Sequence, residues 1–363
     1  MSLDILQPST DLEIETLAPD IPGVNTVAGT YEEQIAELNQ PETVLDPDEP
    51  TLAATSDDPI SAAGAIEPVG MRQIFWRELK ADKRALISLF IFIALMAFVF
   101  IASAVIGNAN ALRPHILNLN QTPSWWPWGP GGSPTGGILG TDGAGRSVMN
   151  VLLVGARNSI LIGFTVSILS IIVGTIVGLI AGYYGGNVDN VIMRILDTLT
   201  IVPTLMIMMV LRTLIVNFTL THMILLLFLF SWLGRARSIR NLTMGQRVLD
   251  YVSASKTLGT RNATIIVRKI LPNLVAMISA DIVLTLGTSI GMETTLTVLG
   301  FGLPIGTPSL GNLIANALVP ANMAMRQWNW LPAVILVFLI MLTINYIGQA
   351  LSRAANAQQR LSA

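Results

Sequence analysis

The chain has 363 residues, of which 52% are hydrophobic and only 12% are charged, and it contains no cysteine. This composition excludes a typical soluble domain, a disulfide framework, a thiolate metal site and a cysteine nucleophile. It indicates a protein that crosses a membrane several times.

The net charge of -2 hides a division of the chain. Residues 1–70 hold 15 of the 23 acidic residues and no Lys or Arg, whereas residues 71–363 hold all 21 basic residues. The acidic segment has no sustained apolar period, so it cannot bury enough surface to offset its ordering entropy. We expect this segment to be a disordered cytoplasmic tail, and the sequence does not indicate its function. The segment lacks the basic and apolar pattern of a signal peptide.

Residues 71–363 are expected to form an all-α, polytopic membrane domain with six spans. The uncharged run at 86–108 would extend roughly 34 Å as a helix, enough to cross a hydrocarbon core of about 30 Å. The predicted spans are 86–108, 160–184, 195–216 with Pro203 inside, 218–233, 274–299 and 331–350. An outer loop is expected at 109–157 and a cytoplasmic loop at 234–272.

The distribution of basic residues supports this topology. Sixteen of the 21 Lys and Arg residues fall in stretches that it places in the cytoplasm, and five in stretches that it places outside. Cytoplasmic loops of membrane proteins carry such an excess of basic residues. Both termini are therefore predicted to be cytoplasmic.

The polar stretch at 250–272 lies between two predicted spans and reads as a pair of helices. One face of the first helix is predicted from the spacing i, i+3 and i+7 of Tyr251, Ala254 and Leu258. Gly259 stands where a left-handed helix C-cap would lie. A second helix is expected to begin at Asn262 and to end at Pro272. Such an insert is either a docking site for a soluble partner or an ordinary charged loop.

The same stretch resembles the EAA loop of permease subunits from bacterial ATP-binding-cassette (ABC) importers. The family pattern is E-A-A, three residues, Gly, about nine residues, then an apolar residue, Leu and Pro. The matching positions here are Ser253, Ala254, Ser255, Gly259, Ile270, Leu271 and Pro272. The resemblance implies that the first helix, with Tyr251 and Leu258, docks into a cleft of a cytoplasmic ATPase. Ser253 replaces the family's Glu, and Asp250, one turn earlier, is the candidate for the polar contact.

Further motifs resemble the dipeptide, oligopeptide and nickel branch of these permeases, and its second, C-type subunit. The branch pattern L-G-T-D-x-x-G-R is matched outside the membrane at residues 139–146, which include Asp142, Gly145 and Arg146. Arg235 and Arg240 resemble its A-R-x-x-R arginines. Glu293 and the T-P-S-L-G-N run at 307–312 resemble motifs that follow in the same order.

The resemblance implies a type I importer permease in the bacterial inner membrane that forms half of a translocation pore for dipeptides or oligopeptides. Its implied partners are a second homologous permease, two ABC ATPases, an extracytoplasmic substrate-binding protein, the peptide and membrane lipid, with no nucleic acid. The chain would bind no cofactor and catalyse no reaction, because ATP and Mg would be bound by the partner ATPases. Its cargo stays open among dipeptides, longer or modified peptides and nickel chelates.

Carboxylates inside the predicted spans are the other candidates for function. A carboxylate at mid-bilayer costs about 2.5 to 3.5 kcal/mol on insertion scales, so each should face a partner or a wet cavity. We expect Glu293 and Asp281 to line the translocation path or its gate, or to make structural hydrogen bonds. Two rival functions remain: an ion-driven transporter using Asp281 and Glu293, and an intramembrane enzyme with Asp197 facing Asp281.

Overall fold

A computed structural model describes residues 82–107, 113–123, 137–304 and 306–362. Within these ranges every regular element is a helix. The expected all-helical membrane architecture is therefore confirmed. The acidic segment predicted at 1–70 lies outside the described residues.

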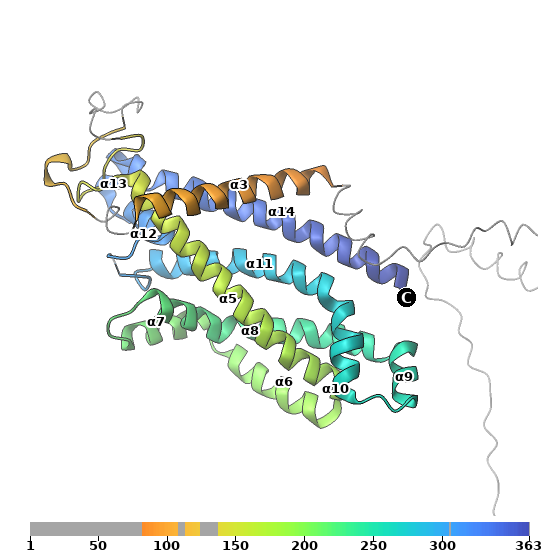
Figure 1. Ribbon diagram of the computed structural model, residues 1–363. Coiled ribbons are helices and arrows are strands. Elements are labelled where there is room, and N and C mark those ends of the chain that lie inside the picture. Colours follow the sequence, from red (N-terminus) through yellow and green to blue (C-terminus); the bar gives the residue numbers. More distant parts are fainter. Residues whose placement is uncertain (1–81, 108–112, 124–136, 305, 363) are drawn as a thin grey trace, which may run out of the picture. The chain divides into compact units, whose positions relative to one another are not determined.

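Five of the described helices are long and apolar enough to cross a membrane (Figure 1). They are α3 (Lys83–Ile106), α5 (Val148–Tyr184), α8 (Leu220–Arg247), α11 (Leu271–Val298) and α14 (Leu331–Ser362). The helices α6 (Gly186–Ile201) and α7 (Thr204–Leu214) pass the same test of length and composition only as a pair, and they are bent by 75° relative to each other, which is the geometry of a broken span or a re-entrant loop. The bend falls at Pro203, since proline lacks an N–H and pushes Val202 out of the helical region to ψ 132.

Several helices extend beyond the predicted spans, and α5, α8 and α14 do so by more than ten residues at one end. Because α5 begins at Val148, residues 148–157 of the expected outer loop are helical. Because α8 continues to Arg247, the first part of the expected loop at 234–272 is helical as well. Hydropathy marks where apolar residues end, whereas a helix continues as long as its backbone bonds and side-chain partners allow.

A stripe of three glycines on α5 sets the close packing of α5 on α8. A Cβ atom at Gly174, Gly178 or Gly182 would lie 2.6 to 2.7 Å from atoms of α8. In lipid, helices associate through such close contact rather than through the hydrophobic effect, so small residues spaced four apart favour it. The stripe therefore holds α5 and α8 together.

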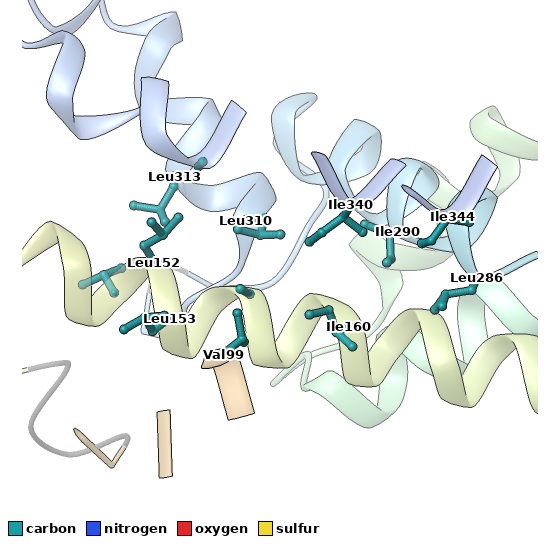
Figure 2. Close-up of a cluster of buried hydrophobic side chains, with 13 residues drawn as sticks. Val99, Leu152, Leu153, Ile160, Leu286, Ile290, Leu310, Leu313, Ile340 and Ile344 are labelled. Carbon is teal, nitrogen blue, oxygen red and sulfur yellow. The ribbon is translucent and has the colours of Figure 1, made fainter. Parts of the chain in front are cut away.

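A larger apolar cluster joins α5 to α3, α11, α14 and α12 (Leu310–Ala315). Figure 2 shows Ile160 of α5, Ile290 of α11 and Ile344 of α14 among its members. Each of these three side chains is at most 1% exposed. The cluster ties the first and last spans to the centre of the bundle.

Asp82 joins the start of α3 to α14. Its carboxylate accepts hydrogen bonds from the backbone N–H groups of Arg84 (3.1 Å) and Ala85 (3.3 Å) and pairs with Arg353. The bond from the Ala85 N–H, and next the Arg353 guanidinium, hold the pKa of Asp82 below its usual value. The N-cap thus serves a tertiary contact as well as the helix end.

Candidate coupling site and polar contacts between helices

The short helix predicted in the polar stretch is present as α9 (Asp250–Thr257). Gly259 follows with φ +74, and the predicted left-handed cap is confirmed. The N–H of Thr260 bonds the Ser255 carbonyl (3.1 Å), and the N–H of Gly259 bonds the Lys256 carbonyl (2.9 Å). These two bonds form a Schellman motif, which ends α9 sharply.

Val252 seats α9 on the membrane helices. It is fully buried in a cluster with Tyr183 of α5, Ile239 of α8, and Ile265, Ile270 and Leu274 from the chain leading into α11. Van der Waals contacts of this kind are individually small but collectively large. The apolar seat therefore couples the position of α9 to three spans.

Two tyrosine hydroxyls reinforce the seat. Tyr251 donates to Gln246 Oε1 of α8 (2.8 Å), and Tyr183 donates to Asn262 Oδ1 (2.8 Å). Tyr251 is half-buried, whereas Ala254 and Leu258 are exposed. The three residues predicted to share one face thus have different surroundings, because the Tyr251 ring turns toward the apolar seat.

The outer side of α9 is open. It carries Asp250, Ser253, Ala254 and, at its end, Leu258, which is 84% exposed. Ser255 turns inward to bond the Tyr251 carbonyl (2.7 Å). The geometry is that of a helix packed on the membrane helices through Val252, with an exposed apolar residue at its end. The exposed carboxylate of Asp250 lies in the first turn, where a negative charge suits the helix dipole.

The second helix begins at Asn262 as predicted (α10, Asn262–Ile265), but the prediction that Pro272 ends it is wrong. A π-helical turn at Ile266–Ile270 leads directly into α11, and the Leu271 N–H bonds the Ile266 carbonyl five residues back. A wider turn of this kind accommodates a proline ring that would clash in a regular helix. Leu271 and Pro272 therefore lie within one 37-residue helix, from Asn262 to Val298.

Three arginines of α8 pair with aspartates of neighbouring helices. The pairs are Arg235 with Asp281 of α11, Arg237 with Asp197 of α6 (2.7 Å), and Arg240 with Asp189 of α6. Asp197 and Asp281 thus bind different arginines and do not form a facing pair. The sequence interpretation noted Arg235 and Arg240 but missed the pairing. The sequence signal that could have predicted the pairing is the group of arginines in α8 together with the aspartates in α6 and α11.

Glu293 is fully buried where α5, α11 and α12 meet. Its carboxylate accepts hydrogen bonds from the hydroxyls of Ser159 (3.0 Å) and Thr297 (3.1 Å). Ser159 in turn accepts the backbone N–H of Leu310 (3.1 Å), the first residue of α12. In this conformation Glu293 clamps α12 to the bundle, and its role in a translocation path stays a prediction.

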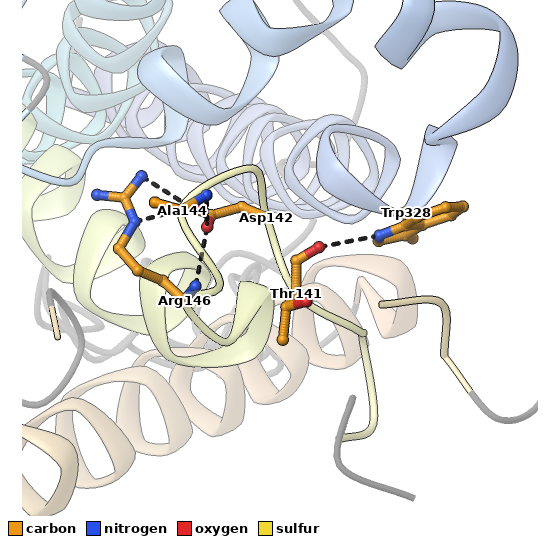
Figure 3. Close-up of polar contacts among 5 residues, drawn as sticks. All are labelled: Thr141, Asp142, Ala144, Arg146 and Trp328. Carbon is orange, nitrogen blue, oxygen red and sulfur yellow. Dashed lines mark hydrogen bonds and ion pairs between the residues drawn. The ribbon is translucent and has the colours of Figure 1, made fainter. Parts of the chain in front are cut away.

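The outer motif forms a tight turn before α5 (Figure 3). Asp142 Oδ1 accepts the backbone N–H groups of Ala144 and Arg146 (both 2.9 Å), and Asp142 Oδ2 pairs with the Arg146 guanidinium (2.7 Å). Gly145 has φ +73 within the turn. The Trp328 indole donates to the Thr141 carbonyl (3.2 Å). These contacts orient the start of α5 and fasten it to the segment before α14.

Two family models match parts of the chain. Residues 174–360 match the family model described as binding-protein-dependent transport system inner membrane component. Residues 70–123 match the model described as the N-terminal TM domain of oligopeptide transport permease C. The first match includes α8, α9 and α11, and thus the whole candidate coupling site.

Curated relatives cover most of the chain. It is 40% identical over 282 residues to the oligopeptide transport system permease protein OppC of Lactococcus lactis subsp. cremoris, covering 78% of this chain and 93% of the relative. It is 30% identical over 288 residues to the dipeptide transport system permease protein DppC of Bacillus subtilis, covering 78% and 85%. It is 31% identical over 284 residues to DppC of Haemophilus influenzae, covering 78% and 93%.

Proposed function

The chain belongs to the family of inner membrane components of binding-protein-dependent transport systems, and we propose that it forms half of the pore of an ATP-driven peptide importer. The family was predicted from the motifs, and the match at 174–360 confirms it. Peptide cargo is supported by relatives that are named oligopeptide or dipeptide permeases. The observation that carries the mechanism is the exposed α9, which is seated rigidly on three spans.

Force would enter through the exposed face of α9. An ATPase that grips Leu258 and Asp250 in a cleft would move α9 when ATP closes the ATPase dimer. Since Val252 is buried in one apolar cluster with residues of α5, α8 and the start of α11, a movement of α9 would shift these helices as well. The unbroken helix from Asn262 to Val298 would carry that shift across the membrane to Asp281 and Glu293. Repacking of the spans then exposes the pore to alternate sides.

The remaining partners follow from the same proposal. A second, homologous permease completes the pore, two ABC ATPases bind ATP and Mg, and an extracytoplasmic protein delivers the peptide. This chain supplies neither ATP hydrolysis nor a cofactor. The α9 end and both termini would lie in the cytoplasm, and the turn formed by Asp142 and Arg146 would lie outside.

The test is ATP-driven uptake by the reconstituted complex with Leu258→Ser. Truncating an anchor at the centre of an interface costs about 2 kcal/mol, so we expect uptake per ATP hydrolysed to fall by up to roughly 30-fold. The matched control is Leu318→Ser, a change at a leucine that is 65% exposed and lies beyond α12. Equal coupling in both variants would contradict the role of α9. Uptake that persists without ATP while an ion gradient is maintained would instead support the ion-driven alternative.

A further inference from the structure

Two cavities follow one another along α8 and α11, the first closed on one side by α7 and the second by Ser352 of α14. The first, about 230 Å³, is bordered by Arg235 and by the hydroxyl side chains of Thr204, Ser231, Thr285, Thr288 and Ser289. The second, about 150 Å³, is bordered by Ser238 and Leu242 of α8 and by Met277, Ala280 and Asp281 of α11. The rest of the first cavity's lining is apolar, formed by Met208, Leu227, Phe230 and Met292, so this cavity combines apolar walls with Arg235 and several hydroxyl groups that can form hydrogen bonds.

The Arg235–Asp281 ion pair lies at the boundary between the cavities. On α8, the first cavity ends at Arg235 and the second begins at Ser238. On α11, which runs in the opposite direction, the second cavity reaches Leu284 and the first begins at Thr285. Arg235 borders the first cavity and Asp281 the second. The pair therefore lies between two cavities of mixed polar and apolar lining within the membrane-spanning part of the chain.

This ion pair leaves part of its hydrogen-bonding capacity unused. The Nη1 atom of Arg235 bonds Oδ1 of Asp281. Within the described residues, the buried atoms Arg235 Nε and Asp281 Oδ2 make no hydrogen bond. A guanidinium has five donors and can hold a carboxylate by two parallel bonds, and a buried polar atom without a partner costs about 1 to 3 kcal/mol. A ligand carboxylate would therefore find an under-satisfied partner at Arg235.

We propose that the first cavity binds the C-terminal carboxylate of a peptide through Arg235, which exchanges Asp281 for the ligand as the peptide passes. The inference rests on the proposed function and names a contact for its cargo. The neighbouring hydroxyls would bond the last peptide unit. A cavity of this size lies below the roughly 300 to 1,000 Å³ of sites that enclose a whole drug-sized ligand, so it takes the end of a peptide.

The exchange couples binding to opening. While Arg235 is bound to Asp281, each charge neutralises the other and the two cavities stay separate. When a carboxylate binds Arg235, Asp281 turns toward the second cavity. There its carboxylate can be solvated by water or can pair with an ammonium group of the cargo. The side chains of Arg235 and Asp281 are 26% and 16% exposed, so part of each is accessible, and the buried Arg235 Nε and Asp281 Oδ2 atoms become accessible to a ligand as the pair separates.

The experiment compares trialanine with trialanine amide, which differ only in the terminal charge. The complete complex with its binding protein is reconstituted in vesicles, and ATP-dependent uptake of each peptide is measured. Arg235→Gln is expected to lower the ratio of trialanine to amide uptake at least tenfold relative to the unsubstituted complex, whereas Arg235→Lys retains part of the ratio. The matched control is Arg237→Gln on the same helix, whose ion pair with Asp197 lies at the surface and whose loss should leave the ratio unchanged.

The outcomes separate the two proposals. An unsubstituted complex that takes up neither peptide would refute the proposed function. Uptake that falls by the same factor for both peptides in Arg235→Gln would overturn the carboxylate site and make the ion pair a structural link between α8 and α11.

If the Arg235→Gln complex does not assemble, or if the amide is not transported, a labelling experiment tests whether the first cavity binds the peptide carboxylate. Since the chain contains no cysteine, Thr288→Cys introduces its only thiol into the first cavity. Trialanine should slow its reaction with a small charged thiol reagent several-fold, and trialanine amide should not. Equal protection by the two peptides, or none by either, would overturn the site.

Discussion

The seat of α9 yields a prediction that can be worked from the structure. Val252→Ala removes two methyl groups from a side chain that is fully buried in the cluster with Ile265 and Leu274. At about 0.8 kcal/mol for each buried carbon, plus a term for the cavity left behind, the loss is about 2 to 3 kcal/mol. The population with α9 detached from its seat should therefore rise roughly 30- to 150-fold, since about 1.4 kcal/mol is tenfold.

Hydrogen exchange and transport together test this estimate. Amides of residues 250–257 should exchange faster in Val252→Ala by about the same factor, and uptake per ATP hydrolysed should fall because a loose helix transmits less motion. Leu258→Ala is the matched control: it truncates an exposed side chain, so it should weaken coupling without changing exchange in α9. Unchanged exchange and unchanged coupling in Val252→Ala would refute the reasoning that the seat transmits force.

Three further predictions concern other contacts. Ser159→Ala should lower the free energy of unfolding in detergent by about 1 to 3 kcal/mol, because it removes a partner of the buried Glu293; Ser167→Ala, which loses only a bond within α5, should cost less. Gly259→Ala should destabilise the end of α9 by about 1 to 2 kcal/mol, measured as faster exchange there, because its φ of +74 disfavours a Cβ. Asp82 has a lowered folded-state pKa, so its stabilising effect is full above its unfolded value near 3.8 and is lost as pH falls through the lower folded value. The difference in thermal stability between the unsubstituted chain and Asp82→Asn should therefore shrink below pH 4, and a constant difference would contradict this.

Features that depend on neighbours in the chain could be predicted from the sequence. The long apolar runs, the short helix that ends before Gly259, and the helix start at Asn262 arise from local backbone preferences and local hydropathy. The family also follows from short motifs in a set order. These signals reside in residues a few positions apart, so no tertiary information is needed to interpret them.

Helix bounds predicted from local sequence were wrong where the geometry of a neighbouring turn changed how far the helix extends. Pro272 was expected to end the second helix, but the π-helical turn before it provides room for its ring, and the helix continues to Val298. Hydropathy likewise placed the start of α5 at residue 160, whereas the helix begins at Val148, and the end of α8 at residue 233, whereas the helix continues to Arg247. It reports preference for lipid and not the extent of backbone hydrogen bonding.

Only the tertiary structure decided which polar groups meet. Arg235 and Asp281 are 46 positions apart, and Ser159 and Glu293 are 134 apart. The spacing of residues along one helix predicts a face of that helix, but it does not say which face of which other helix lies against it. That choice depends on the close packing of α5 on α8 and on the continuous helix through α11. The sequence alone thus determines the family and the approximate positions of the helices, including the short helix α9, whereas packing determines the clamp at Glu293 and the ion pair between the two cavities.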